Sequence, residues 1–204
     1  MNNESNPYQS YVAARTRQNP CLQNLSNFLT NDRSNRNSCR IACLEFSTSG
    51  VVSHKRLDLK NLASLLQSQA GEDKNLRGRL LVIEDLSSNI IEMLGCALNI
   101  DPFFFSSHIG VSQTDIAAAR PYRATLPSMA KSQDFLTIQY HRVLQFEYHG
   151  SKETLLRDMN VPRKVRMLPP VKGANIGLAR HCCSILKTVG KDGLWLGKKS
   201  STFL

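Results

Sequence analysis

The chain has 204 residues, of which 41% are hydrophobic and 21% charged, and its formal net charge is +10. This length predicts one domain with a buried core, and the composition excludes collagen-like and wholly disordered proteins. No apolar run reaches the roughly 20 residues that a membrane-spanning helix needs. The first ten residues, MNNESNPYQS, carry neither a signal-peptide core nor an Arg-rich transit pattern, so we expect a cytoplasmic protein with no membrane span.

The N-terminal residues 1–38 are predicted to form a flexible, partly helical lead. Asn and Ser are frequent in this segment, and apolar residues between Tyr11 and Thr30 recur at irregular helical spacing. We expect a single folded domain over residues 39–197 and a basic tail over residues 198–204.

A hairpin and a helix are predicted at the start of this domain. Residues 40–46 alternate as a strand does, Thr48-Ser49-Gly50 favour a turn, and residues 51–57 can return as a second strand. Asp58 is a suitable cap for a helix over residues 59–70, whose leucines fall on one face.

A buried strand and two helices follow. The apolar run of residues 80–85, LLVIED, is typical of a strand that is covered on both faces. Ser87 or Ser88 can cap a helix over residues 89–99, and Asp101-Pro102 favour the start of a short helix, PFFFSSHI.

The remaining residues are predicted to be mostly extended. Residues 110–132 indicate an exposed segment, residues 135–148 a long strand, residues 161–170 an extended stretch, and residues 176–189 a strand or a pair of strands. The element order predicts an α/β fold, with α+β as the alternative, in which helices flank a mixed β-sheet.

Known catalytic and nucleotide-binding motifs are missing from the sequence. It contains no G-x4-G-K-[ST] loop, no G-x-S-x-G elbow and no H-E-x-x-H pair. Glu84 and Asp85 end a predicted strand, where α/β proteins often place catalytic groups, but adjacent strand residues point to opposite faces. We therefore expect these acids to cap a helix or order a loop, and we expect a non-enzymatic protein without a cofactor.

The six cysteines lack the C-x2-C spacing of zinc and redox sites. His181, Cys182 and Cys183 are consecutive in a predicted strand, so their side chains cannot close on one metal ion. Cys39 and Cys43 are expected to act as small buried hydrophobes.

The positive charge lies mainly in the second half of the chain. Residues 103–204 hold 15 basic and 6 acidic residues, whereas residues 1–102 hold 11 and 10. This pattern indicates either a solvated basic face or a surface that binds a polyanion, and the cations are too dispersed to favour nucleic acid. The candidate contacts for an anion or a partner are Arg163, Lys164, Arg166 and Lys172.

Three segments together resemble the N-terminal domain of fungal CorA-like proteins, relatives of the magnesium channels. They are residues 78–109, residues 135–147 and residues 160–186. In CorA cytosolic domains a strand, a helix and an L-x-I-x-P helix start precede a strand of the F-x-x-I type. Here these correspond to LLVIED, the helix over residues 89–99, Asn99-Ile100-Asp101-Pro102 and FLTIQYHRV, and the likeness extends over about residues 8–197.

The resemblance implies an α/β domain that forms homo-oligomers or binds a CorA-like membrane paralogue. Since such domains sense divalent cations through acidic sites, it also makes Mg²⁺ a ligand to consider, with Glu84, Asp85 and Asp101 as candidate ligands. The sequence departs from the family in having no stalk helix, no pore helices and no Gly-Met-Asn motif, because Asp158-Met159-Asn160 lacks the glycine. We therefore expect a truncated domain.

Three functions stay open from the sequence. The first is a non-enzymatic CorA-like interaction or sensor module that does not transport ions by itself. The second is an accessory protein of a fungal pathway, such as one encoded by a secondary-metabolite gene cluster. The third is polyanion binding through the basic C-terminal third.

Overall fold

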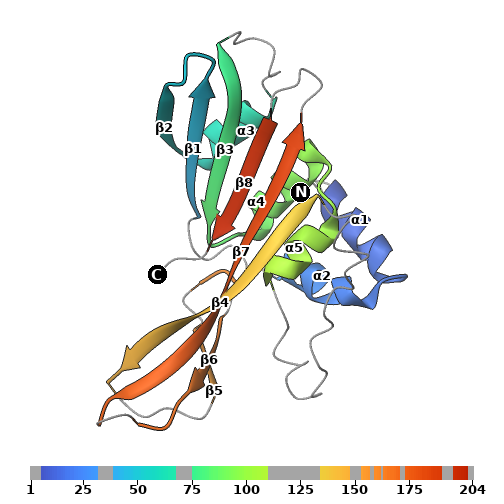
Figure 1. Cartoon of the computed structure of the whole chain (residues 1–204). Helices are drawn as coiled ribbons and strands as arrows, with labels where there is room; N and C mark the ends of the chain where they lie inside the picture. The colour runs from blue at the N-terminus through green and yellow to red at the C-terminus, as the bar shows by residue number, and fades with distance from the viewer. Residues whose placement is uncertain are drawn as a thin grey trace.

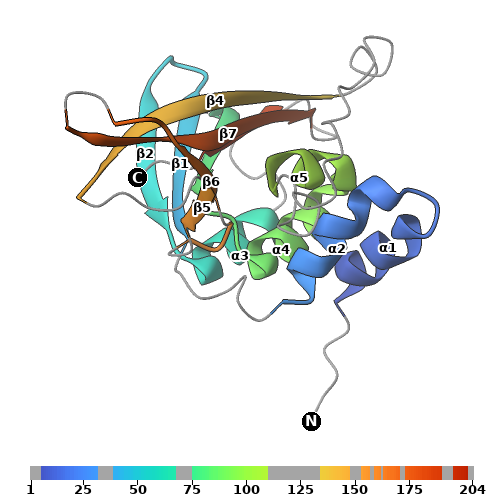
Figure 2. The same cartoon turned by 90° about the horizontal axis from the view of Figure 1, so that it is seen from below.

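The computed structural model combines one mixed β-sheet with a layer of helices on one of its faces (Figure 1). Seen from below, the helices lie together on one side of the strands (Figure 2). The predicted fold class, α/β with a mixed sheet, is therefore confirmed. The residues that the structure describes are 6–31, 39–67, 75–109, 134–147, 153–156, 159–161, 163–170, 173–189 and 195–201.

The N-terminal helices belong to the main hydrophobic core. They are α1 (Pro7–Thr16), a 3-10 turn η1 (Pro20–Leu22) and α2 (Gln23–Leu29). Tyr8 and Leu25 are buried in the same cluster as residues of the central helices. The helical part of the prediction for residues 1–38 agrees with these helices, but the described residues 6–31 are not a separate lead, because their apolar side chains fill the core.

The predicted hairpin and the helix after it are confirmed. Strands β1 (Arg40–Ser47) and β2 (Val52–Leu57) are antiparallel, and Gly50 occupies the turn with a φ of +84°. Helix α3 (Leu59–Gln67) follows. The Asp58 carboxylate caps it by accepting a hydrogen bond from the backbone N–H of Asn61 at 2.7 Å.

The central strand and the two helices after it also match the prediction. They are β3 (Leu76–Glu84), α4 (Ser88–Leu98) and α5 (Pro102–Ile109). Ser87 caps α4 by accepting from the backbone N–H of Ile90 at 3.4 Å, and α4 ends at Asn99, which has a left-handed φ of 48°.

Two long strands dominate the second half of the chain. Strand β4 (Phe135–Phe146) is antiparallel to β7 (Asn175–Val189) along its entire length. The short strands β5 (Glu153–Leu156) and β6 (Arg163–Met167) pair with each other, and β6 pairs with the start of β7. These short strands and the adjoining ends of β4 and β7 form an arm that projects away from the helices (Figure 1).

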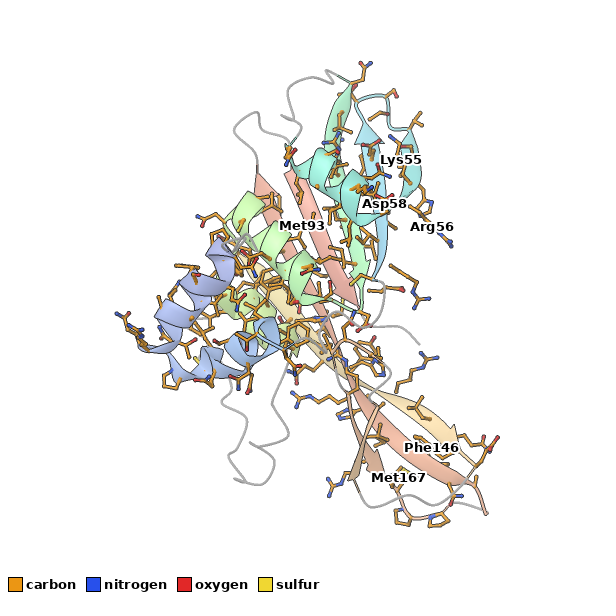
Figure 3. The ribbon with its side chains drawn as sticks, turned by 180° about the vertical axis from the view of Figure 1, so that it is seen from behind. Lys55, Arg56, Asp58, Met93, Phe146 and Met167 are labelled. Carbon is orange, nitrogen blue, oxygen red and sulfur yellow. The ribbon has the colours of Figure 1, made fainter. Side chains whose placement is uncertain are left out.

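A second, small hydrophobic cluster stabilises the arm. Val165, Met167 and Ala179 are buried there, and Leu144 and Phe146 pack against them. Figure 3 shows Phe146 and Met167 on the arm, far from the helix layer. The arm therefore has apolar packing of its own.

The expected basic tail is wrong for residues 198–201. Residues Trp195–Ser201 form strand β8, which lies between β3 and β7 in the sheet. It is parallel to β3 and antiparallel to β7, whereas all other described strand pairs are antiparallel. Backbone pairing on both edges holds this polar segment in place.

Some predictions fall outside the described residues. These include the exposed segment over residues 110–132, the end of the third helix beyond Gln67, and residues 202–204. Among the helices that are described, none is long and apolar enough to cross a membrane.

Candidate interaction surface

The two faces of the sheet differ in what covers them. Strand side chains alternate between faces, so the core contacts fix the orientation of each strand. Cys43, Leu81 and Leu186 belong to the buried cluster that contains Phe104 of α5, and Phe135 packs against it. Their strand neighbours point to the opposite face, here called the open face: Ala42, Leu44, Leu80, Val82, Leu136, Ile138 and Ile185.

The open face carries apolar side chains that reach solvent. Leu136, Ile138 and Ile185 are 57%, 47% and 37% exposed, and Leu44 and Leu80 are partly exposed. Leu44 lies opposite Leu80, and Leu136 lies opposite Ile185. Single exposed hydrophobic residues are ordinary, but a face on which they recur across several strands is typical of an interaction site.

Basic side chains border the open face. On the edge strand β2, His54 lies opposite Leu44 and Arg56 lies opposite Ala42, and both are exposed. On β7, Lys187 is exposed two positions beyond Ile185 and therefore points to the same face. The described part of the open face thus carries apolar side chains on β1, β3, β4 and β7, basic residues on β2 and β7, and the acids Glu84 and Asp134.

The candidate metal-binding acids each have another role. Glu84 lies 2.6 Å from the guanidinium of Arg40. The Asp101 carboxylate caps α5 by accepting from the backbone N–H of Phe103 at 2.9 Å, and it lies 3.8 Å from Arg15.

Asp85, directly after β3, binds the backbone of residues 160 and 161. Its carboxylate accepts from the backbone N–H groups of Asn160 at 3.0 Å and Val161 at 3.2 Å, and its φ is +56°. Its carbonyl accepts from the Cys39 thiol at 2.8 Å. In the described ranges no three Asp, Glu, His or Cys side chains come together, so Glu84, Asp85 and Asp101 do not fit a shared Mg²⁺ site.

The candidate anion contacts are divided between interior and surface. Arg163 is only 5% exposed and donates a hydrogen bond to the carbonyl of His108 at 3.4 Å. It cannot contact a partner directly, and this part of the prediction is wrong because Arg163 lies at the buried start of β6. Arg166 is exposed, whereas the Lys164 side chain and Lys172 lie outside the described part.

A buried polar network joins α5 to β7 and β4. Nδ1 of His108 lies 3.2 Å from Oγ of Ser184, which lies 3.3 Å from Oγ1 of Thr137. Burial, with a smaller contribution from the charge of Arg163, lowers the pKa of His108 to about 3, so this imidazole is neutral. Because His108 and Ser184 are both 0% exposed, the pair tethers α5 to the sheet and offers no access to a substrate.

The histidine and cysteines at residues 181–183 diverge, as the strand pattern predicts. The His181 ring stacks on Tyr140 with centroids 5.6 Å apart. The Cys182 thiol lies 3.8 Å from the carbonyl of Ser107 on the helix side. Cys43 is buried, as expected for a small hydrophobe, whereas Cys39 is only partly buried and donates its thiol to the Asp85 carbonyl.

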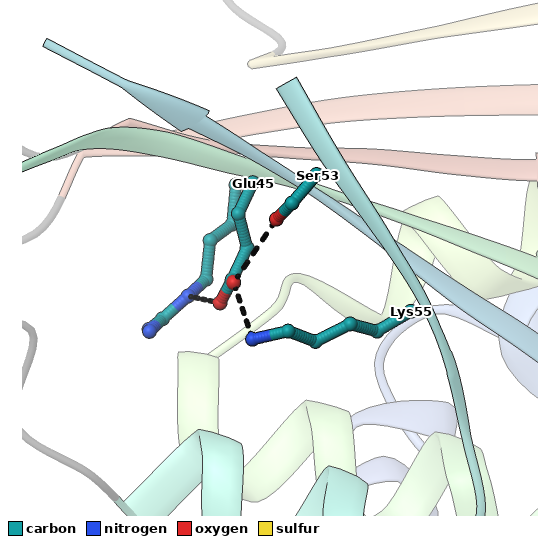
Figure 4. Close-up of polar contacts among 4 residues, drawn as sticks. Glu45, Ser53 and Lys55 are labelled. Carbon is teal, nitrogen blue, oxygen red and sulfur yellow. Dashed lines mark hydrogen bonds and ion pairs between the residues drawn. The ribbon is translucent and has the colours of Figure 1, made fainter. Parts of the chain in front are cut away.

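A charged cluster occupies the helix side of the β1–β2 hairpin (Figure 4). Glu45 accepts from Lys55 at 2.7 Å and from Arg79 at 3.1 Å. The hydrogen bond from Lys55, followed by that from Arg79, holds the pKa of Glu45 below its usual range. This cluster cross-links β1, β2 and β3 on the face opposite to the open face.

Comparison with known protein-family models and with curated proteins finds no match for this chain. The sequence pattern did not reveal the open face, because the face depends on which side of each strand the helices cover.

Proposed function

We propose that this chain is a non-enzymatic interaction module that binds a protein partner through the open face. The observation that carries the proposal is the recurrence of exposed apolar side chains on β4 and β7 and of partly buried ones on β1 and β3. The basic rim of His54, Arg56 and Lys187 favours a partner whose apolar surface is bordered by acidic side chains.

A CorA-like role forms part of this proposal. The order of β3, α4, α5 and β4 matches the order of elements on which the resemblance to CorA cytosolic domains rests. A CorA-like membrane paralogue would then be one such partner. Sensing of a divalent cation has less support, because Glu84, Asp85 and Asp101 each contact a different part of the chain.

Polyanion binding through the C-terminal third is less favoured. Its first candidate, Arg163, is buried, and only Arg166 of the four candidates has an exposed described side chain. This alternative predicts that affinity for a labelled oligonucleotide falls steeply with salt concentration.

Site-specific photo-cross-linking tests the proposal. A photoreactive amino acid is placed at Ile185 on the open face and, as the matched control, at Leu59 on α3, which is 45% exposed. We expect a discrete protein adduct from position 185 that position 59 does not give, and a partner with an acidic surface. No adduct from position 185, or the same adduct from both positions, would contradict the proposal.

A further inference from the structure

Strand β4 forms an outer edge of the sheet along its whole length (Figure 1). Strand β4 pairs with residues 175–186 of β7. On the same strand, β6 pairs with residues 177–179 and β8 pairs with residues 183–189. Since a strand has only two edges, β6 and β8 share one edge of β7 and β4 takes the other. Within the described ranges, no strand pairs with the free edge of β4.

Two of the outer edge strands of the sheet, β2 and β4, differ in chemistry. Strand β2 has six residues, which include His54, Lys55 and Arg56, and charges of this kind protect an edge from pairing (Figure 3). Strand β4 has twelve residues but only one permanently charged residue, Arg142, and it exposes Leu136, Ile138 and Val143. A long edge with exposed aliphatic side chains is suited to pairing with another strand.

The β4 sequence is complementary to itself about Ile138. Asp134 lies four residues before Ile138 and Arg142 lies four residues after it, and both are exposed. In an antiparallel pair of two β4 strands centred on Ile138, Asp134 of one copy faces Arg142 of the other. Leu136 then faces Tyr140, so an apolar centre lies between two ion pairs.

The face geometry is consistent with this register. Two residues that lie opposite each other in an antiparallel pair point to the same face. Asp134, Leu136, Ile138, Tyr140 and Arg142 are separated by two residues each, so all five have the same orientation. A twofold axis that passes through Ile138 perpendicular to the sheet therefore keeps the open faces of both copies on the same side of the joined sheet.

We propose that two copies of this chain form a dimer by antiparallel pairing of β4 with β4, centred on Ile138. The Asp134–Arg142 complementarity identifies the occupant of the edge as a second copy. The inference goes beyond the proposed partner site, because it uses the edge of β4 and leaves the open face accessible.

Sedimentation of the full chain over a concentration series tests the dimer. We expect a mass that rises to twice that of the chain. Asp134→Arg and Arg142→Asp should each weaken the dimer by about tenfold, and the double exchange Asp134→Arg/Arg142→Asp should restore it. The matched control Arg56→Asp, on the edge strand β2, should leave it unchanged.

A cysteine cross-link tests the register independently of the charge variants. In a chain with Cys21→Ser, Cys96→Ser and Cys183→Ser, the last because Cys183 lies opposite Ile138 on β7 of the same chain, Ile138→Cys should form a disulfide between copies when diamide oxidises the two thiols. Position 138 meets itself at the axis. Val143→Cys should not. A monomer at every concentration, a dimer that neither charge variant weakens, or equal cross-linking at positions 138 and 143 would overturn the proposal.

Discussion

The carboxylate of Glu92 on α4 caps the first turn of α1, with Oε1 2.7 Å from the backbone nitrogen of Tyr8. Its other oxygen accepts from the backbone N–H of Gln9 at 2.9 Å. Asn6 precedes the helix and makes no side-chain capping bond. The free N–H groups of α1 are therefore satisfied by a residue more than 80 positions away, which ties the N-terminal segment to the domain.

Removing the charge of this cap should loosen α1. Glu92→Gln keeps the size of the side chain but loses one acceptor oxygen and the charge, so we expect the free energy of unfolding to fall by about 1 kcal/mol. Urea unfolding gives this value, and faster amide exchange in α1 would locate it. Glu147→Gln, at an exposed acid beyond β4, is the control, and equal stability of the two variants would count against the cap.

Gly95 allows the Tyr8 ring to pack closely against α4. A Cβ on Gly95 would lie 2.5 Å from the Tyr8 ring, and the Tyr8 hydroxyl donates to the carbonyl of Ile100 at 2.8 Å. Gly95→Ala should destabilise the protein by about 2 kcal/mol, although alanine normally favours a helix.

A double-mutant cycle checks this explanation. Tyr8→Ala removes the ring that would clash, so Gly95→Ala should cost much less in the Tyr8→Ala background. Thermal unfolding measures the stability of the single and double variants. If the losses of the two single variants simply add in the double variant, the contact with Tyr8 is not the reason why position 95 needs glycine.

The buried imidazole of His108 predicts a loss of stability in acid. Its pKa is about 3 in the folded chain, below the 6.5 of an exposed histidine. The unfolded chain then binds more protons between these values, so stability is complete above pH 6.5 and falls as the pH drops toward 3. The loss from this group between pH 7 and pH 5 should be about 2 kcal/mol.

His108→Gln separates this effect from other acid effects. The variant should be less stable at pH 7, because the contacts with Ser184 and Arg163 change, but its stability should depend less on pH between 7 and 5. His54→Gln, at an exposed histidine on β2, is the control. The same pH dependence in all three proteins would refute the assignment to His108.

Local patterns predicted the centre of the fold. Ser87, the apolar stripe of α4 and the alternation in β4 act through neighbours in sequence, and each formed the expected element. Strand β8 was missed because Lys198 and Lys199 suggest solvent exposure, whereas its place is set by backbone pairing with β3 and β7.

The surface and the N-terminal segment required the tertiary structure. Glu92 gives no local signal, because it binds backbone groups distant in sequence. Arg163 appears as one of several cations in the sequence, yet its position beside His108 buries it. The open face becomes visible only when the helices are seen to cover the other side of the sheet (Figure 2).

Titration of the cross-linked partner against rim variants tests the central claim most directly. Arg56→Glu/Lys187→Glu reverses two exposed charges of the rim, and Lys60→Glu reverses one on α3, away from the open face. If the open face is the binding site, calorimetry should show about tenfold weaker binding for the rim variant and wild-type affinity for the control. Equal affinities for the rim variant, the control and the wild type would contradict the account.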